Sequence, residues 1–248
     1  MKKISVKIDQ KELIANFWET GIENPRGIFY IHHGMAEHID RYNYFAEQLN
    51  SKGYHVVGHN HLGHGNNKEN GEGVFARSEG WKKVCYEAKV VCDHFNNLFP
   101  EIPSYLFGHS MGSFVSISSL KNIENLDGVF LTGTFLPNKG QLFFLKTLLL
   151  IEKLVFRINE NSKIHKINFQ RLNSVFKNTR TDFDWLANDT HVVDKYIDDP
   201  DCGFVCSNSL WLDFIYGCEM VLRESTCLLY TSDAADEGLG VDLGGRRI

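Results

Sequence analysis

The start of the chain alternates between apolar and polar residues, whereas several later segments are apolar throughout. Residues 4–9 and 13–18 alternate on either side of a polar turn, which predicts the two strands of a hairpin. Four short apolar runs are each expected to form a further strand: residues 28–31, 54–57, 104–107 and 129–131. The first and last of these runs have no polar face, so we expect them to be buried.

Apolar residues recur at helical spacing between these strands. Over residues 39–52 they fall on one helical face, and Gly53 follows where that helix should end. Residues 81–99 carry a longer stripe of the same kind, and Pro100 ends it. A hairpin followed by alternating strands and helices predicts an α/β protein whose mostly parallel sheet is covered by helices.

The alternation stops after the strand at 129–131. Residues 134–226 look mainly helical, are rich in Phe and Leu, and show no clear strand. We therefore interpret residues 1–133 as the N-terminal part of the α/β core and residues 134–226 as an inserted helical lid or cap.

The last segment, residues 227–248, reads CLLYTSDAADEGLGVDLGGRRI and has no sustained period. Codons that would encode residues 227–237 and 241–248 resemble a transposon-end sequencing adapter read in one frame. We interpret 227–248 as an adapter-derived tail that is not part of the native fold.

Composition narrows the class of protein. The 248 residues carry a formal net charge of -5, which disfavours nucleic-acid binding because phosphate contacts need a basic surface. The N-terminus lacks the apolar core of a secretory signal, and charges interrupt the most apolar stretch, residues 142–158. The six Cys residues form no CxxC pair, which is typical of free thiols. We therefore expect a cytoplasmic protein.

The strongest chemical signal is Gly108-His109-Ser110-Met111-Gly112, directly after the predicted strand at 104–107. A serine hydroxyl is a useful nucleophile when a tight strand-to-helix turn exposes it beside a base and oxyanion donors. The G-x-S-x-G pattern builds such a turn, since its glycines let strand and helix approach closely. Ser110 is therefore the candidate nucleophile.

A second signal, His33-Gly34-Met35-Ala36-Glu37-His38, follows the predicted strand at 28–31. A His-Gly turn in this place can present a backbone N–H toward Ser110. The candidate oxyanion donors are the backbone amides of Met35 and Met111, with His33, Gly34, Gly108, His109 and Gly112 in support. We expect the side chains of Glu37, His38, Arg41 and Tyr42 to brace this loop.

The third signal, His59-Asn60-His61-Leu62-Gly63-His64-Gly65, is similar to the H-x-H-x-x-H motif of zinc hydrolases. Zinc hydrolases usually have Asp where this chain has Gly63, and they need further ligands downstream. We therefore favour a loop of packed, hydrogen-bonded histidines and expect no metal site.

Together these motifs give a specific resemblance. HGMAEHIDRY (33–42), HNHLGHG (59–65) and GHSMG (108–112) resemble, in order and spacing, the monoacylglycerol lipase and lysophospholipase family, also described as serine aminopeptidase-like hydrolases. The resemblance covers about residues 10–224, with Asn60 in place of the family's usual Asp. It implies an α/β-hydrolase fold with a helical lid and no metal or organic cofactor.

The resemblance also implies a catalytic acid and base that this chain lacks. In α/β-hydrolases the order is Ser, then Asp or Glu, then His, on strands after the lid. Family-like sequence ends near Glu224, so we expect the last strands, the triad Asp and the triad His to be absent from this chain. His165 and His191 lie in the predicted lid and are poor substitutes. We expect this fragment to be inactive.

The resulting prediction is a serine ester hydrolase acting on monoacylglycerol- or lysophospholipid-like esters. Its partners would be a small lipid or ester substrate and, through the apolar lid, a transient membrane-surface contact, with no nucleic acid. Three alternatives stay open at this point: a peptidase or other acyl-transfer enzyme on the same fold, a zinc hydrolase, and a non-catalytic binding protein with a vestigial serine turn.

Overall fold

The computed structural model describes residues 1–135, 138–157, 159–160 and 162–228, so the predicted tail lies outside the described residues except for its first two positions. One six-stranded sheet runs in the order β1-β2-β4-β3-β5-β6. The strands are β1 (Lys2–Ile8), β2 (Lys11–Trp18), β3 (Gly27–His32), β4 (Tyr54–His59), β5 (Ser104–His109) and β6 (Gly128–Thr132). The hairpin β1–β2 and the pair β2–β4 are antiparallel, and the other neighbours are parallel. The mostly parallel sheet is confirmed.

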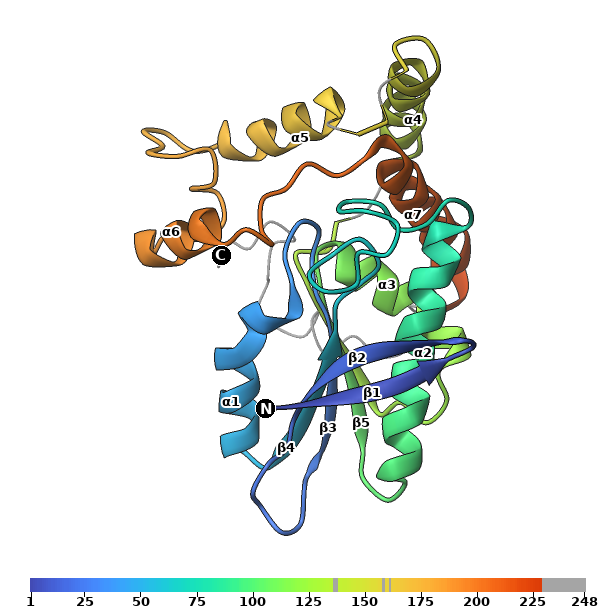
Figure 1. The fold of residues 1–248 in the computed structure, drawn as a ribbon, viewed down its shortest axis with the longest axis vertical. Helices are drawn as coiled ribbons and strands as arrows, with labels where there is room; N and C mark the ends of the chain where they lie inside the picture. The colour runs from blue at the N-terminus through green and yellow to red at the C-terminus, as the bar shows by residue number, and fades with distance from the viewer. Residues whose placement is uncertain (136–137, 158, 161, 229–248) are drawn as a thin grey trace.

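Helices cover both faces of this sheet (Figure 1). One face packs against α2 (Gly80–Leu98), through a cluster that includes Ile28, Tyr30 and Leu106. The other face packs against α1 (Asn43–Ser51), through a cluster that includes Ile31 and Val56. Alternate side chains of each central strand therefore enter opposite cores, which is why these strands are apolar throughout.

The two predicted helices are present with small changes at their starts. The first begins as a 3-10 turn, η1 (Ile39–Tyr42), before α1, and Gly53 follows it with φ +89°. That left-handed backbone explains the glycine at the helix end. α2 ends at Leu98, two residues before Pro100.

The strand expected at residues 129–131 is present as β6, but the expectation that it is buried is wrong. β6 lies at the edge of the sheet, next to β5, and Phe130 is 50% exposed. Val129 and Leu131 are only half-buried. Among the described residues no strand pairs with the outer side of β6.

The described part of residues 134–228 consists of helices and connecting loops and contains no strand. These helices are α4 (Lys139–Leu154), α5 (Lys163–Asn173), α6 (Thr190–Asp198) and α7 (Asn208–Leu228). Side chains of Asn138, Ser162 and Asp189 accept hydrogen bonds from the first-turn amides of α4, α5 and α6, which explains where each begins.

α7 is joined to the core of the protein. It packs against α2 and against α3 (Met111–Ser119), and one apolar cluster contains Trp81, Phe114 and Leu210. The carboxylate of Asp213 also accepts hydrogen bonds from the first amides of α2, and burial raises its pKa to about 6. The boundary drawn at residues 133 and 134 stays a prediction, but the packing is continuous across it.

Candidate active site

Ser110 lies at the turn between β5 and α3, where it precedes the first residue of the helix. Its φ is +51°, in the left-handed region that non-glycine residues seldom adopt. The end of β6 holds this turn, because the Ser110 N–H donates to the Thr132 carbonyl over 2.8 Å. His109 Nδ1 lies 2.9 Å from the Thr132 hydroxyl. Strained backbone of this kind is typical of functional residues and is the geometry expected of an exposed nucleophile.

The glycines beside Ser110 are explained by close backbone approach. A Cβ on Gly108 would lie 2.5 Å from the Ser116 hydroxyl and 2.7 Å from the Gly112 carbonyl oxygen. A Cβ on Gly112 would overlap the carbonyl oxygens of His32 and His33 at the end of β3. Any side chain at either position would push α3 away from the sheet, so the G-x-S-x-G spacing is a packing requirement here.

The loop after β3 lies next to this turn, since a Cβ on Gly34 would lie 3.3 Å from the His109 ring. His33 Nδ1 is 2.7 Å from the Gly34 carbonyl oxygen, which can only accept, so Nδ1 carries the proton. In a trans peptide the carbonyl and the following N–H point in opposite directions. The Met35 N–H therefore points away from the His33 ring, and among the described residues it has no acceptor.

Side chains at the far end of the loop brace it as expected. Glu37 Oε1 accepts from the Gly34 N–H over 2.5 Å and from the Tyr42 hydroxyl over 2.8 Å. The other oxygen, Oε2, lies 3.3 Å from Arg41 Nε. Asn60 Oδ1 accepts from the Ile39 N–H over 2.8 Å, so the amide at this position supplies the acceptor oxygen that an Asp would supply.

The histidine-rich motif, residues 59–65, packs against this loop. His64 Nε2 accepts from the Ala36 N–H over 3.2 Å, and His33 Nε2 accepts from the His61 N–H over 3.0 Å. The expected packing is present, but the expected hydrogen bonding is only partial. Both ring nitrogens of His61, and Nε2 of His59, have no partner among the described residues.

Burial keeps the five histidines of this region uncharged. Desolvation lowers the pKa of His32 and of His64 to about 4, and that of His59 to about 3. The pKa values of His33 and His61 also lie well below the usual value, because of burial first and neighbouring histidines second. His64 and His33 can accept hydrogen bonds through Nε2 only while their rings are neutral.

We expect this cluster to make the protein acid-sensitive. Each pKa is lower in the folded than in the unfolded chain, so stability is full above about pH 6.5 and falls as the pH drops toward the folded values. Each such His contributes up to about 1.4 kcal/mol per pH unit in that window. The free energy of unfolding, from denaturant titrations at pH 7, 6 and 5, should fall steadily.

Replacement of His59 by Gln should reduce that slope, whereas replacement of the exposed His191 by Gln should leave it unchanged. Equal stability at pH 7 and pH 5 would show that the buried rings do not control acid sensitivity.

One cluster of side chains elsewhere in the described residues brings three possible metal-ligand atoms close together. The ligand atoms of His38, Asp199 and Cys202 lie within 4.8 Å of one another, whereas His59, His61 and His64 form no such group. The Arg41 guanidinium lies 3.8 Å from the Cys202 sulfur, and His38 Nε2 is 2.8 Å from an Asp199 oxygen. An arginine beside the thiol opposes cation binding, so these contacts favour a hydrogen-bonded junction.

A catalytic base for Ser110 is not found among the described residues. No described histidine makes a hydrogen bond to the Ser110 hydroxyl. His165 is buried in α5, where its Nδ1 accepts from the Trp211 indole N–H over 3.2 Å. His191 is exposed on α6.

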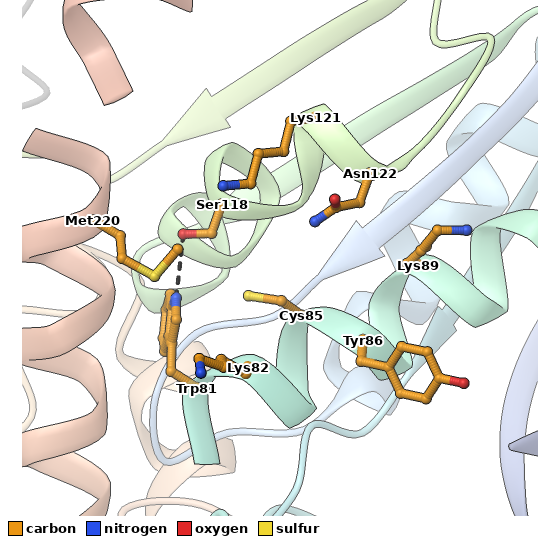
Figure 2. Close-up of a pocket in the computed structure, with 9 residues that line it drawn as sticks. All are labelled: Trp81, Lys82, Cys85, Tyr86, Lys89, Ser118, Lys121, Asn122 and Met220. Carbon is orange, nitrogen blue, oxygen red and sulfur yellow. Dashed lines mark hydrogen bonds between the residues drawn. The ribbon is translucent and has the colours of Figure 1, made fainter. Parts of the chain in front are cut away.

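A pocket of about 340 Å³ lies between α2, α3 and α7 (Figure 2). Two of its lining residues are bonded to each other: the Trp81 indole N–H donates to the Ser118 hydroxyl over 3.2 Å. Ser118 is two helical turns beyond Ser110, roughly 12 Å along α3. Two lysines of α2 that line the pocket form ion pairs: Lys82 with Glu79 and Lys89 with Asp93. This pocket is separate from the Ser110 turn.

A mostly parallel sheet with helices on both faces, and a strained serine between a strand and a helix, define an α/β-hydrolase. Solved structures share this fold. The structure of a carboxyl esterase from Bacillus coagulans in complex with glycerol matches with a TM-score of 0.75 and 21% identity, over 89% of this chain and 73% of that chain. A monoglyceride lipase from Saccharomyces cerevisiae matches with a TM-score of 0.64 and 16% identity, over 89% of this chain and 69% of that chain.

The family profile described as serine aminopeptidase, S33 matches residues 23–228, so the chain belongs to this family. A monoglyceride lipase homolog of Monkeypox virus is 30% identical over 160 residues, 64% of this chain and 55% of the relative. Rat (Rattus norvegicus) monoglyceride lipase is 31% identical over 119 residues, 45% of this chain and 35% of the relative. The resemblance drawn from the motifs is confirmed, and the chain spans only part of these relatives.

No helix among the described residues is long and apolar enough to cross a bilayer. The cytoplasmic location stays a prediction, as does the role assigned to each candidate site residue.

Proposed function

We propose that this protein is a serine ester hydrolase for monoacylglycerol- or lysophospholipid-like carboxylic esters. The observation that carries the proposal is Ser110, held at φ +51° between β5 and α3. Its hydroxyl oxygen would attack the ester carbonyl carbon, the alcohol would leave, and water would then cleave the acyl-serine.

The oxyanion of that reaction would be held by two backbone amides. The Met35 N–H has no acceptor among the described residues and points away from the His33 ring. Met111 is the first residue of α3, and first-turn amides have no acceptor within their own helix. Preorganised donors of this kind stabilise the developing charge without reorganisation during the reaction.

The general base and its orienting acid would come from chain outside these 248 residues. Support comes from the described histidines, none of which makes a hydrogen bond to the Ser110 hydroxyl. A serine without its base is a poor nucleophile. We therefore propose that the 248-residue chain is inactive by itself.

The ester substrate class is supported by relatives described as monoglyceride lipases and by the apolar surface of α4. The two alternatives are a peptidase or other acyl-transfer enzyme and a non-catalytic binding protein. The complete gene product should be assayed with a monoacylglycerol, a lysophospholipid and an aminoacyl anilide. Ester cleavage with the anilide intact supports the proposal, anilide cleavage favours a peptidase, and no turnover favours the binding protein.

A transient membrane-surface contact through α4 and α5 is part of this proposal. The two helices lie at the same end of the molecule (Figure 1). On α4, Phe143 is 72% exposed, Phe144 is 64% exposed and Leu154 is 71% exposed. Exposed basic side chains lie on the same two helices: Lys139, Lys163, Lys166 and Arg171. Apolar side chains beside basic ones are typical of a helix that lies on an anionic membrane surface.

We expect the double substitution Phe143→Ser with Phe144→Ser to weaken vesicle binding by about 100-fold or more, since each Phe loses about 1.5–3 kcal/mol of burial. Co-sedimentation with vesicles of phosphatidylcholine and phosphatidylglycerol measures the binding of the parent and of the variants. Tyr44→Ser is the matched control, because Tyr44 is 73% exposed on α1. Equal vesicle binding by the parent, the double variant and Tyr44→Ser would show that α4 makes no membrane contact.

A further inference from the structure

The loop that carries Met35 is fastened to a distant part of the chain. We call residues 33–38 the oxyanion loop and residues 196–203, at the end of α6 and just after it, the strap. Both the Tyr196 hydroxyl and the Gly203 N–H donate to the Ala36 carbonyl oxygen, over 2.8 Å and 2.9 Å. These contacts join segments 160 residues apart in the sequence.

Ala36 is a position where such fastening matters. Its φ is +55°, a left-handed conformation that costs free energy for a residue with a Cβ, and it is fully buried. Its N–H is held by His64 Nε2 and its carbonyl by the strap. With both polar groups held, the backbone around Ala36 cannot relax by rotation of its peptide groups.

Two further contacts seat the strap on the loop. Asp199 Oδ2 lies 2.8 Å from His38 Nε2, at the end of the oxyanion loop. The Arg41 guanidinium lies 4.6 Å from the centre of the Tyr196 ring and 3.8 Å from the Cys202 sulfur. Tyr196 is 2% exposed, so its hydroxyl has no access to water as an alternative partner for the Ala36 carbonyl.

We propose that the strap, through Tyr196 above all, is a positioning element that holds the oxyanion loop in the conformation that aims the Met35 N–H. The claim that the strap holds the loop in one conformation concerns loop order alone. The claim that this conformation aims the Met35 N–H rests on the proposed function. Ala36 directly follows Met35, so a peptide rotation at Ala36 would turn the Met35 backbone as well. Tyr196 touches no reacting atom in this scheme.

The test is Tyr196→Phe in the complete gene product, which removes one hydroxyl and keeps the ring. Tyr30→Phe is the matched control: Tyr30 is 1% exposed, and its hydroxyl lies 2.5 Å from Asn96 Oδ1 and 3.3 Å from the Cys92 carbonyl, away from the loop. Asp199→Ala is a second variant from the opposite end of the strap.

Amide hydrogen exchange of residues 33–38 is the first readout. Loss of one net buried hydrogen bond should raise exchange in the loop by about tenfold in Tyr196→Phe, and by less in Asp199→Ala. Tyr30→Phe should leave loop exchange unchanged. Unchanged exchange in Tyr196→Phe overturns the proposal, whether or not the protein cleaves esters.

Ester kinetics are the second readout. In Tyr196→Phe we expect kcat to fall about tenfold with KM unchanged, because oxyanion binding is realised in the transition state. The rate ratio of an ester to its thionoester, with C=S in place of C=O, should also fall, since a weakened oxyanion hole discriminates less between oxygen and sulfur.

If Tyr196→Phe shows faster loop exchange but an unchanged ester-to-thionoester rate ratio, the claim that the strap aims the Met35 N–H is overturned. Faster exchange in a protein that has no esterase activity supports the strap as a loop-ordering element, and it is the proposed function that then fails.

Discussion

Replacement of Ser110 by Ala in the complete gene product should lower ester turnover by about 10⁴–10⁶. The hydroxyl is the atom that would bond to the acyl carbon, and no other described nucleophile occupies the β5–α3 turn. Ser110 is only half-buried and its side chain makes no hydrogen bond among the described residues, so its loss should barely change stability.

The measurement is the initial rate of monoacylglycerol cleavage together with a thermal melt. Ser118→Ala is the control, because Ser118 lies on the same helix and bonds Trp81 instead. Its turnover should match that of the parent. Full turnover in Ser110→Ala would place the nucleophile at another residue.

The 248-residue chain should turn over esters at least about 10⁴-fold more slowly than the complete gene product. The reason is the Ser110 hydroxyl, which has no histidine partner among the described residues. The chain should also melt at a lower temperature and aggregate, because β6 lies at the sheet edge with Phe130 50% exposed.

Side-by-side rates and melts of the two proteins test this prediction, with Ser110→Ala in the 248-residue chain as the matched control. That substitution should cause almost no further loss, since residues that act as a catalytic unit are not additive. A soluble monomer with the turnover of the complete product would mean that these residues already contain the whole machinery.

The sequence predicted the parts of the site that depend on local chemistry. Gly108 and Gly112 predicted the tight strand–helix turn, because only a residue without a Cβ allows the backbone approach seen there. The short apolar runs predicted the central strands, since two covered faces leave no polar side. Spacing alone was enough in both cases.

Contacts between distant segments were not predictable in this way. Nothing in the sequence near Tyr196 or Gly203 indicates that both bond the Ala36 carbonyl, because that pairing depends on how α6 packs. The exposure of Phe130 in β6 was missed for a similar reason, since an apolar run does not say how much of each face of its strand is covered. The unpartnered nitrogens of His61 are likewise visible only once the five histidines are packed.

The central claim, that Ser110 is the reactive nucleophile, is tested most directly by mapping a covalent adduct. The complete gene product is treated with a fluorophosphonate, digested and sequenced by mass spectrometry. We predict one phosphonyl group, on Ser110, in the peptide that contains Gly108 to Gly112, and no adduct in Ser110→Ala. An adduct on a different residue, or none in a protein that cleaves esters, would contradict the account.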